Sequence, residues 1–466
     1  MKRLLVVILG LLLTTACKKN VIIPPVQSQI KDTIKLDTTK PTNPKVGFVI
    51  DTNWFASKYP GFWIETHNGN GSGDFNKDGL KDLVVMFATN SPAKHLFQTN
   101  EMSRIVVGVF INNKTYFELD TNLVYSYLGG FAGVNVSDIN KDGYLDLYQM
   151  TGYWEGADYP KPKYYNNSGW GGMDSYVFIN DKNKSLKKYT LTNQNDAGST
   201  TSIIIDNNKN GFEEIYLSSC LCYYEFDGNN FNRNQLTLDN KFKGQSYNLN
   251  VITPKFASEK SGVIYGAENV YGESYFLLKV INNKITPIIN YKPAYPNSGC
   301  AQEINVEDLD KDSKLEYIIP MEISSNSNNS TPAIPYLMIV DELGNDVSKK
   351  YMDDEITKPL TFEQMNWVGE TWQTGFIYHT FTDIDNDNIS EIFPASGVGY
   401  KKGNDTYYYK FKDSKYRLEL YHNNWLGDVH KSRGYINYKP FVDEKNKVNV
   451  FLPVEGNLLK AVFKTF

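Results

Sequence analysis

The sequence predicts an all-β protein of the β-propeller class, and three observations predict it. A nine-residue acidic motif occurs five times, starting at positions 74, 138, 206, 308 and 383. Short runs of apolar and β-branched residues flank the motifs, which is typical of buried strands. The motifs recur at the spacing of one small sheet, and a regular period of this kind indicates a propeller or a repeat array. Each repeat therefore reads as strand, loop, strand.

Alternate positions of the motif carry oxygen. Positions 1, 3, 5 and 9 hold Asp, Asn or Glu in all five copies, which we call loops 1 to 5. Hard divalent cations prefer such ligands, and Ca²⁺ takes six to eight oxygens at roughly 2.3–2.6 Å. The predicted side-chain ligands are Asp74, Asn76, Asp78 and Asp82; Asp138, Asn140, Asp142 and Asp146; Asp206, Asn208, Asn210 and Glu214; Asp308, Asp310, Asp312 and Glu316; and Asp383, Asp385, Asp387 and Glu391.

Position 6 has to turn the chain sharply, so we expect a positive φ there. Gly79, Gly143 and Gly211 suit this conformation, and Asn388 is the next best residue. Ser313 is the poor match and weakens loop 4. The ligand charges also differ, because Asn208 and Asn210 replace acids in loop 3. We therefore expect loop 3 to lose its ion first on chelation, and loop 4 to be the most highly charged site.

The motif differs from an EF-hand loop, although both begin alike. An EF-hand closes with a bidentate Glu at position 12 and lies between helices. In loop 1 the closing carboxylate is at position 9, and position 12 is Val85 inside a β pattern. The alternative is a set of ordinary hairpin turns rich in Asp, Asn and Gly. Five copies in one frame favour the cation loops.

Two further repeats lack the acidic ligands. The interval from position 206 to 308 is long enough for two units, and residues 252–265 fit the loop-then-strand frame between them. Residues 439–453 again combine a polar loop with a β run. The total is seven units of roughly 60 residues, and such units need neighbours to bury their apolar faces.

These repeats resemble the FG-GAP/VCBS family, the calcium-loop blades of integrin-α-type β-propellers. The resemblance implies seven four-stranded blades, with cation loops between the first two strands of each blade on one face of the ring. It also implies several Ca²⁺ ions, each held by the side chains at positions 1, 3, 5 and 9 and by the backbone carbonyl of position 7. The position 7 residues are Leu80, Tyr144, Phe212, Lys314 and Ile389. Ser313, Asn388 and the two units without loops depart from the family pattern, which leaves the blade number open.

The N-terminus predicts export and lipid anchoring. Residues 1–16 combine Lys2 and Arg3 with an apolar core and small residues before Cys17, which resembles a bacterial lipoprotein signal peptide. The alternative is a plain secretory signal. Lipid on Cys17 would anchor the protein in a membrane. Residues 17–45 are rich in Lys, Thr and Pro and predict a flexible tether, and the propeller spans residues 46–466. We expect a bacterial cell-envelope protein at the outer membrane or cell surface.

Composition excludes some partners and suggests others. The net charge of −5 and the absence of a basic patch argue against nucleic acid. An aromatic-rich insertion at residues 153–176 suits the apolar faces of sugar rings, although packing against the blade edge is the alternative. Its candidate ligand-binding residues are Trp154, Tyr159, Tyr164, Tyr165 and Trp170. The second aromatic stretch, residues 366–378, fits blade packing better.

The sequence contains no catalytic motif that we recognise, and its five histidines have no metal-ligand spacing. Cys220, Cys222 and Cys300 leave an odd number after Cys17, and a bridge from Cys220 or Cys222 to Cys300 is one pairing. We therefore expect a monomeric, calcium-binding module for a glycan or protein ligand. The alternatives are a polysaccharide-active lyase or glycosidase and a non-catalytic scaffold in an envelope complex.

Overall fold

The computed structural model describes most of the predicted repeats. The described residues are 47–49, 57–58, 71–88, 104–114, 116–128, 133–150, 164–165, 171–172, 175–191, 202–217, 221–239, 247–252, 260–269, 275–295, 298–300, 304–323, 334–359, 379–383, 387–394, 400–402, 405–422, 441–442, 448–454 and 458–463. All described residues belong to one unit of the chain, residues 45–466.

The protein is all-β, as predicted. The described strands form seven sheets of three or more strands in chain order, together with one two-stranded sheet. The first sheet contains β1 (Gly47–Val49), β2 (Gly71–Gly73), β3 (Asp82–Ala88), β4 (Arg104–Asn112) and β5 (Tyr116–Leu128). The second contains β6 (Gly133–Ser137), β7 (Asp146–Met150), β10 (Ser175–Asn180) and β11 (Leu186–Leu191). The third contains β12 (Ser202–Ile205), β13 (Glu214–Leu217), β14 (Cys222–Phe226) and β15 (Phe231–Gln235).

The other four sheets are also built from strands that follow one another in the chain. The fourth contains β16 (Thr237–Leu238), β17 (Tyr247–Ile252), β18 (Ile264–Asn269), β19 (Tyr275–Ile281) and β20 (Lys284–Tyr291). The fifth contains β21 (Ser298–Cys300), β22 (Asn305–Glu307), β23 (Glu316–Ile323) and β24 (Ile334–Val340). The sixth contains β25 (His379–Thr382), β26 (Glu391–Pro394), β27 (Tyr400–Lys402), β28 (Asp405–Lys412) and β29 (Lys415–His422). The seventh contains β30 (Phe441–Val442), β31 (Val448–Val454) and β32 (Leu458–Phe463). The short pair β8 (Tyr164–Tyr165) and β9 (Gly171–Gly172) and the short helix α4 (Ser348–Tyr351) complete the described elements used below.

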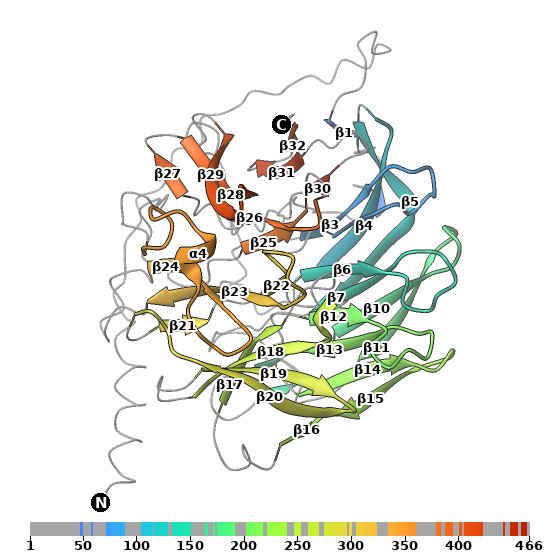
Figure 1. The fold of residues 1–466 in the computed structure, drawn as a ribbon. Helices are drawn as coiled ribbons and strands as arrows, with labels where there is room; N and C mark the ends of the chain where they lie inside the picture. The colour runs from blue at the N-terminus through green and yellow to red at the C-terminus, as the bar shows by residue number, and fades with distance from the viewer. Residues whose placement is uncertain are drawn as a thin grey trace, which may run out of the picture. The chain divides into compact units, whose positions relative to one another are not determined.

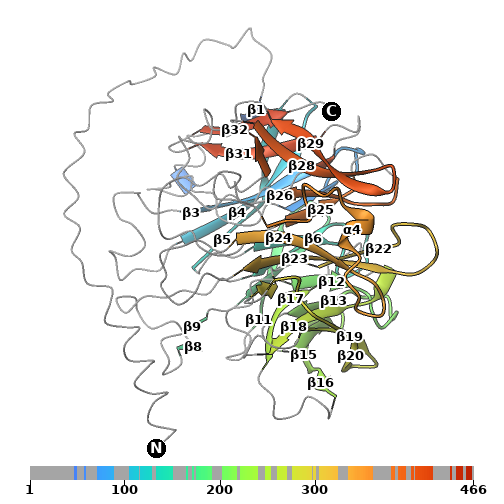
Figure 2. The same cartoon turned by 60° about the vertical axis from the view of Figure 1, so that its left-hand side comes forward.

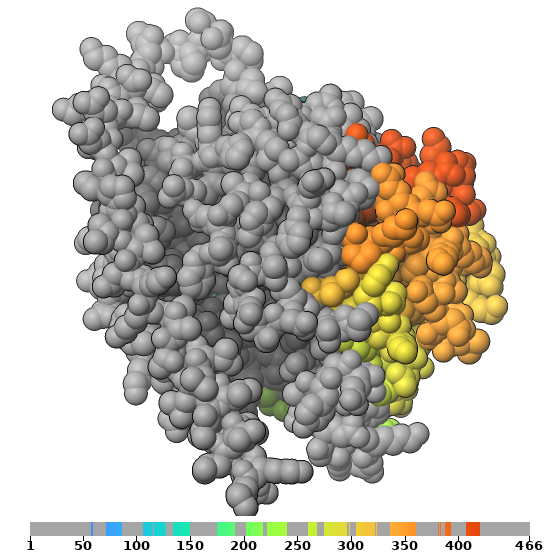
Figure 3. All heavy atoms as spheres, turned by 90° about the vertical axis from the view of Figure 1, so that its left-hand side faces the viewer, coloured from blue at the N-terminus to red at the C-terminus, as the bar shows by residue number. Residues whose placement is uncertain are grey.

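The sheets succeed one another in space as they do in sequence. The chain colours run from blue through green and yellow to red from sheet to sheet (Figure 1), and a second view shows the same succession (Figure 2). On the face shown in Figure 3, yellow, orange and red segments follow one another across the described surface. Such a succession of small antiparallel sheets is β-propeller-like.

Neighbouring sheets share apolar cores. One buried cluster joins the first and second sheets, and four others join the second to the third, the third to the fourth, the fourth to the fifth and the fifth to the sixth. For example, Val84 of β3 and Leu147 of β7 belong to one cluster, and both are fully buried. At the other end of the succession, β1 of the first sheet lies against β32 of the seventh. The first six sheets are thus joined in sequence by shared buried cores.

Some segments that precede a sheet pair in parallel with the outer strand of that sheet. Strand β1 precedes the first sheet and pairs in parallel with its outer strand β5, and β16 does the same with β20 of the fourth sheet. Met352, which follows α4, makes a parallel bridge to Tyr416 of β29. Each of these three contacts is made at the outer strand of its sheet.

Candidate cation-binding loops

All five acidic motifs join two paired antiparallel strands near the start of a sheet, as the sequence predicts, although in the fifth sheet the short strand β21 comes before this pair. Loop 1 (residues 74–82) connects β2 to β3, loop 2 (138–146) connects β6 to β7, and loop 3 (206–214) connects β12 to β13. Loop 4 (308–316) connects β22 to β23, and loop 5 (383–391) connects β25 to β26. Position 9 of each loop is the first residue of the second strand. The sheet pairing thus fixes both ends of every loop.

The predicted turn at position 6 is confirmed in every loop. The φ angles are 88° at Gly79, 86° at Gly143, 94° at Gly211, 68° at Ser313 and 70° at Asn388. A second left-handed residue at position 4 was not predicted. It is a lysine in the first four loops, with φ of 63° at Lys77, 57° at Lys141, 60° at Lys209 and 61° at Lys311. A non-glycine residue adopts this conformation at a cost, so the surrounding contacts must hold it.

The carboxylate at position 1 organises the turn. In loop 1, Asp74 accepts hydrogen bonds from the backbone N–H of Asp78 at 3.1 Å and of Gly79 at 2.9 Å. The bond from position 6 to position 1 is present in all five loops. The position 5 side chain likewise accepts the N–H of position 7 in every loop. The five motifs therefore share one turn at position 6.

The position 9 carboxylate is buried and ties the loop to its sheet. Asp82 accepts the N–H of Phe75 and of Asn112, both at 2.8 Å, and Asp146 makes the equivalent pair with Ile139 and Asn180. Burial raises the pKa of Asp82 to about 6 and that of Asp146 to about 7. The negative charges of Asp78 and Asp142, at position 5, also raise these pKa values. A buried negative charge of this kind needs a compensating positive one.

Three loops also hold buried carboxylate oxygens that accept no hydrogen bond. These are Asp138 Oδ1 in loop 2, Glu214 Oε1 in loop 3 and Asp308 Oδ1 in loop 4. Buried polar atoms nearly always have a partner, and an unpartnered one points to a missing ion or water. A set of side chains that offers only oxygen suits Ca²⁺. The donors present therefore fit a hard divalent cation.

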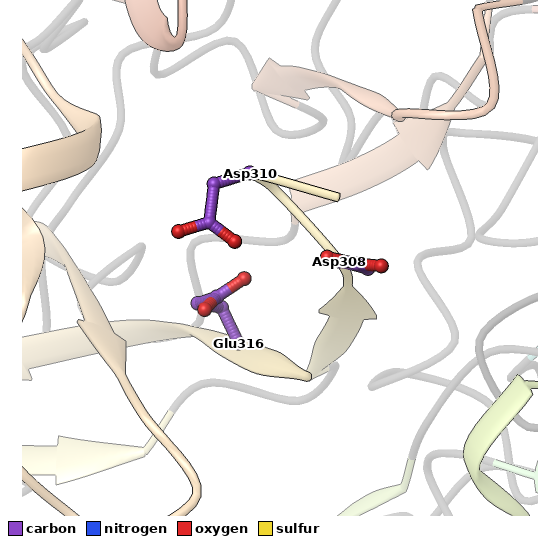
Figure 4. Close-up of side chains that lie close together, drawn as sticks. All are labelled: Asp308, Asp310 and Glu316. Carbon is purple, nitrogen blue, oxygen red and sulfur yellow. The ribbon is translucent and has the colours of Figure 1, made fainter. Parts of the chain in front are cut away.

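Loop 4 brings its acids closest together. One carboxylate oxygen from each of Asp308, Asp310 and Glu316 lies within 4.8 Å of the others, as Figure 4 shows. Two residues from the region of α4 reach into this cluster, a contact that sequence reasoning missed. Lys350 Nζ donates to Asp310 at 2.7 Å, and the Tyr351 hydroxyl donates to Asp310 at 2.8 Å. The Lys350 hydrogen bond lowers the pKa of Asp310, so loop 4 already contains a positive charge.

Loop 3 receives an additional acid from outside the motif. Glu225 of β14 accepts hydrogen bonds from the side-chain amides of Asn208, at 3.1 Å, and Asn210. Burial raises the pKa of Glu214 to about 7, and the charge of Glu225 adds to the effect. The nine-residue motif does not predict Glu225, because this residue lies outside the motif and is brought to the loop by strand pairing.

Loop 5 is described in part. Asp383, Asp387, Ile389 and Glu391 lie at positions 1, 5, 7 and 9, whereas Asp385 lies outside the described residues. Asp383 accepts the N–H groups of Asp387 and Asn388, as position 1 does in loops 1 and 3. The described part of loop 5 thus has the same turn.

The loops also contact the next sheet. The apolar residue at position 2 is buried in a cluster shared by two sheets, as with Phe75, Ile139 and Leu309. Lys141 of loop 2 pairs at 2.7 Å with the buried Glu213 of loop 3. Lys77 of loop 1 lies 3.6 Å from the ring centroid of Tyr144 in loop 2. Ordering a loop therefore also orders the contact between two sheets.

Several predicted features lie outside the described residues. They are Cys17, the signal and tether residues 1–45, Trp154, Tyr159, Trp170 and residues 366–378. Tyr164 and Tyr165 form β8, but their side chains are outside the description. Cys222 is buried and disulfide-bonded, whereas Cys220 and the side chain of Cys300 are not described. No described helix is long and apolar enough to cross a membrane.

Comparisons with known proteins give no family assignment. No protein-family model matches the chain, and no curated protein sequence matches it. Solved structures with distant similarity include the following three. A protein from Lactobacillus plantarum is 10% identical, over 76% of this chain and 84% of its own, with a TM-score of 0.39. The mannose phosphorylase MPT-4 from Leishmania mexicana is 10% identical, over 84% and 91%, with a TM-score of 0.28. BBS1N, solved in complex with ARL6DN, is 8% identical, over 69% and 93%, with a TM-score of 0.30. At these TM-scores the similarities decide neither fold nor function, which we argue from the chain's own residues.

Proposed function

We propose that this chain is a calcium-stabilised β-propeller at the bacterial cell envelope, serving as a binding module for a glycan or protein. The observation that carries the proposal is the set of buried carboxylate oxygens without a hydrogen-bond partner, Asp138 Oδ1, Glu214 Oε1 and Asp308 Oδ1. They lie in three loops of one conformation, each built only from oxygen ligands. A divalent cation would satisfy them and neutralise the buried charge.

Each ion would be held by the side chains at positions 1, 3, 5 and 9 and by the carbonyl at position 7. When bound, calcium would supply positive charge at the loop. The chain's own residues connect the loop to its sheet and to the next sheet. Position 1 holds the turn, and position 9 accepts backbone N–H groups from position 2 and from the third strand. Position 2 fills the core shared with the next sheet. A bound ion would therefore stabilise the interface between two sheets as well as one loop.

We further propose that the seven sheets are seven blades of a closed ring. Shared cores between successive sheets support this arrangement, as does the contact of β1 with β32, which joins the first sheet to the seventh. Closure matters because a single blade leaves an apolar face exposed. The fourth sheet, without an acidic motif, would depend on its apolar core, in which Val263 and Tyr265 are fully buried.

Thermal unfolding of the purified protein tests the calcium proposal. A ligand that binds only the folded state raises the melting temperature by mass action. We expect a higher melting temperature in millimolar calcium chloride than in EDTA, with a smaller effect of magnesium, which demands a stricter octahedral geometry. Equal melting temperatures in calcium and in EDTA would refute the proposal.

The ligand and the anchor need separate experiments. A glycan array and an affinity pull-down with the calcium-loaded protein test binding, and every hit is then incubated to look for turnover. Binding without product supports the binding module, whereas a new reducing or unsaturated end identifies a polysaccharide-active enzyme. Mass spectrometry of the membrane fraction should find lipid on Cys17, and Cys17→Ser should release the protein from that fraction.

A further inference from the structure

Loop 3 is the acid-poor member of the five motifs. Loop 1 supplies three carboxylates of its own, Asp74, Asp78 and Asp82. Loop 3 supplies two, because positions 3 and 5 are asparagines. Calcium affinity in loop sites follows the number of charged ligands. By its motif alone, loop 3 is therefore the weakest site.

Strand pairing places a third carboxylate at this loop. Glu225 of β14 is directly opposite Glu214 of β13 in the antiparallel register. In the first and second sheets the register places Ile111 and Ile179 opposite position 9, and in the fifth sheet it places Asp341 there. Asp341 accepts hydrogen bonds from Leu343 and Asn345 of its own turn, whereas Glu225 is hydrogen-bonded to the side chains at positions 3 and 5 of loop 3.

The side chain of Glu225 lies over the ligand positions. It accepts hydrogen bonds from the amides of Asn208 and Asn210, which are positions 3 and 5, and from Asn234 Nδ2 at 3.4 Å. An amide offers an oxygen as well as an NH₂ group, and a half-turn exchanges the two. The same side chains that surround the Glu225 carboxylate would then surround a cation bound beside it.

Glu214 gives an independent indication of a cation here. It is fully buried, and its Oε2 accepts the N–H of Asn207 at 2.8 Å, whereas its Oε1 has no hydrogen-bond partner. Two like charges directly opposite each other on neighbouring strands destabilise a sheet. Among the described residues, neither Glu214 nor Glu225 has a lysine or arginine partner. A cation between them would remove the repulsion and satisfy Oε1.

We infer that Glu225 is a further ligand of the loop 3 cation, supplied by the third strand to replace the acids missing at positions 3 and 5. The inference rests on the proposed function, because it concerns one ligand of one proposed site. It gives loop 3 three carboxylates, equal to loops 1 and 2. Loop 3 should then hold its ion as long as they do, contrary to the order expected from the motif.

Hydrogen–deuterium exchange mass spectrometry of the full-length protein can test this loop by loop. Exchange is measured across a calcium chloride titration, in peptides covering residues 71–88, 133–150 and 202–217. In Glu225→Gln, the calcium concentration that half-protects residues 202–217 should rise about tenfold, because affinity follows ligand charge. Residues 71–88 and 133–150 should keep their midpoints. Glu419→Gln is the matched control, since Glu419 is also a half-buried strand glutamate but lies on β29.

A second variant separates ligation from a merely structural role. Asn208→Asp in the Glu225→Gln background returns the third carboxylate at position 3, so it should restore the midpoint of residues 202–217. If Glu225 acted only through its hydrogen bonds, Asn208→Asp would not restore the calcium midpoint of residues 202–217. An unchanged midpoint in Glu225→Gln, with calcium protection present in all three peptides, would overturn the inference alone. No calcium protection in any peptide would instead overturn the proposed function.

Discussion

Single side chains decide how strongly each loop can hold an ion. The five loops share the turn at position 6, so differences between them come from the residues at the ligand positions and from neighbours outside the motif. Asp78 of loop 1 shows the double role of a ligand position. It accepts the N–H of Leu80 at 2.8 Å, and it is one of three carboxylates around the proposed ion.

Replacing Asp78 by Ala should therefore destabilise the calcium-loaded protein. The loss of one hydrogen bond to a charged acceptor and of one ion ligand is worth about 1–3 kcal/mol. Urea unfolding in calcium should show this decrease in the free energy of unfolding, and the decrease should shrink in EDTA. Asp32→Ala, in the predicted tether, is the control and should leave the stability unchanged. Equal effects of Asp78→Ala in calcium and EDTA would mean that Asp78 has no role as a ligand.

In loop 4 a lysine competes for the same acids. Because Lys350 Nζ lies 2.7 Å from Asp310, a calcium ion has to displace the ammonium group or share the carboxylate with it. Lys350→Gln should lower the calcium concentration that half-protects residues 304–323 by about fivefold, since the site regains a free acid. Exchange mass spectrometry measures this midpoint. Lys349→Gln removes the same charge from the adjacent, exposed residue and should leave the midpoint where it is. An unshifted midpoint in Lys350→Gln would contradict the competition.

At the scale of the loop and its two strands, the turn at position 6 limits which residues fit. Ser313 has φ of 68° and therefore occupies a conformation that favours glycine. Gly79 has φ of 88°, and a Cβ added there would meet no atom within 4 Å. Any cost of a side chain at residue 79 is therefore conformational rather than steric.

Reciprocal substitutions should have opposite effects on stability. Ser313→Gly should raise the free energy of unfolding by about 0.5–1 kcal/mol, and Gly79→Ser should lower it by about 1 kcal/mol, because non-glycine residues are disfavoured in this region. Urea unfolding in saturating calcium compares the two variants with the unaltered protein. A destabilising Ser313→Gly would show that the serine side chain contributes more than its strained backbone costs.

Much of this element could be predicted from the sequence. The apolar runs before and after each motif predict the strands, and the glycines and Asn388 at position 6 predict the turn. Ser313 is the poor match by sequence, yet it has the same left-handed conformation. Glu225 and Lys350 could not be predicted as members of loops 3 and 4, because they lie beyond the motif and reach it through strand pairing and α4. The two-residue strand β16 could not be predicted either, because it is defined by its parallel pairing with β20, which lies far along the chain.

At the scale of the whole molecule, the loops connect ion binding to the contacts between sheets. In loops 1, 2 and 4 the residue at position 2 is buried between two sheets, as Phe75 is between the first and second, while position 9 of the same loop is a buried acid. In the ion-free protein these acids are buried groups whose negative charge is costly. The stability of the whole array should therefore depend on their protonation.

This dependence has a definite sign. The folded-state pKa values of Asp82, Asp146 and Glu214 are raised to about 6, 7 and 7, above the ordinary value near 4 in the unfolded chain. A group with a raised pKa binds its proton more tightly in the folded state, so its contribution favours folding at low pH and is lost as pH rises through the folded pKa. In EDTA, the melting temperature should fall between pH 5 and pH 8. In excess calcium the ion replaces the proton, and this fall should be absent, because the ionised carboxylates are then neutralised. Thermal scans at matched ionic strength in the two conditions measure both curves. Parallel curves in EDTA and in calcium would mean that these buried acids are not where the ion binds.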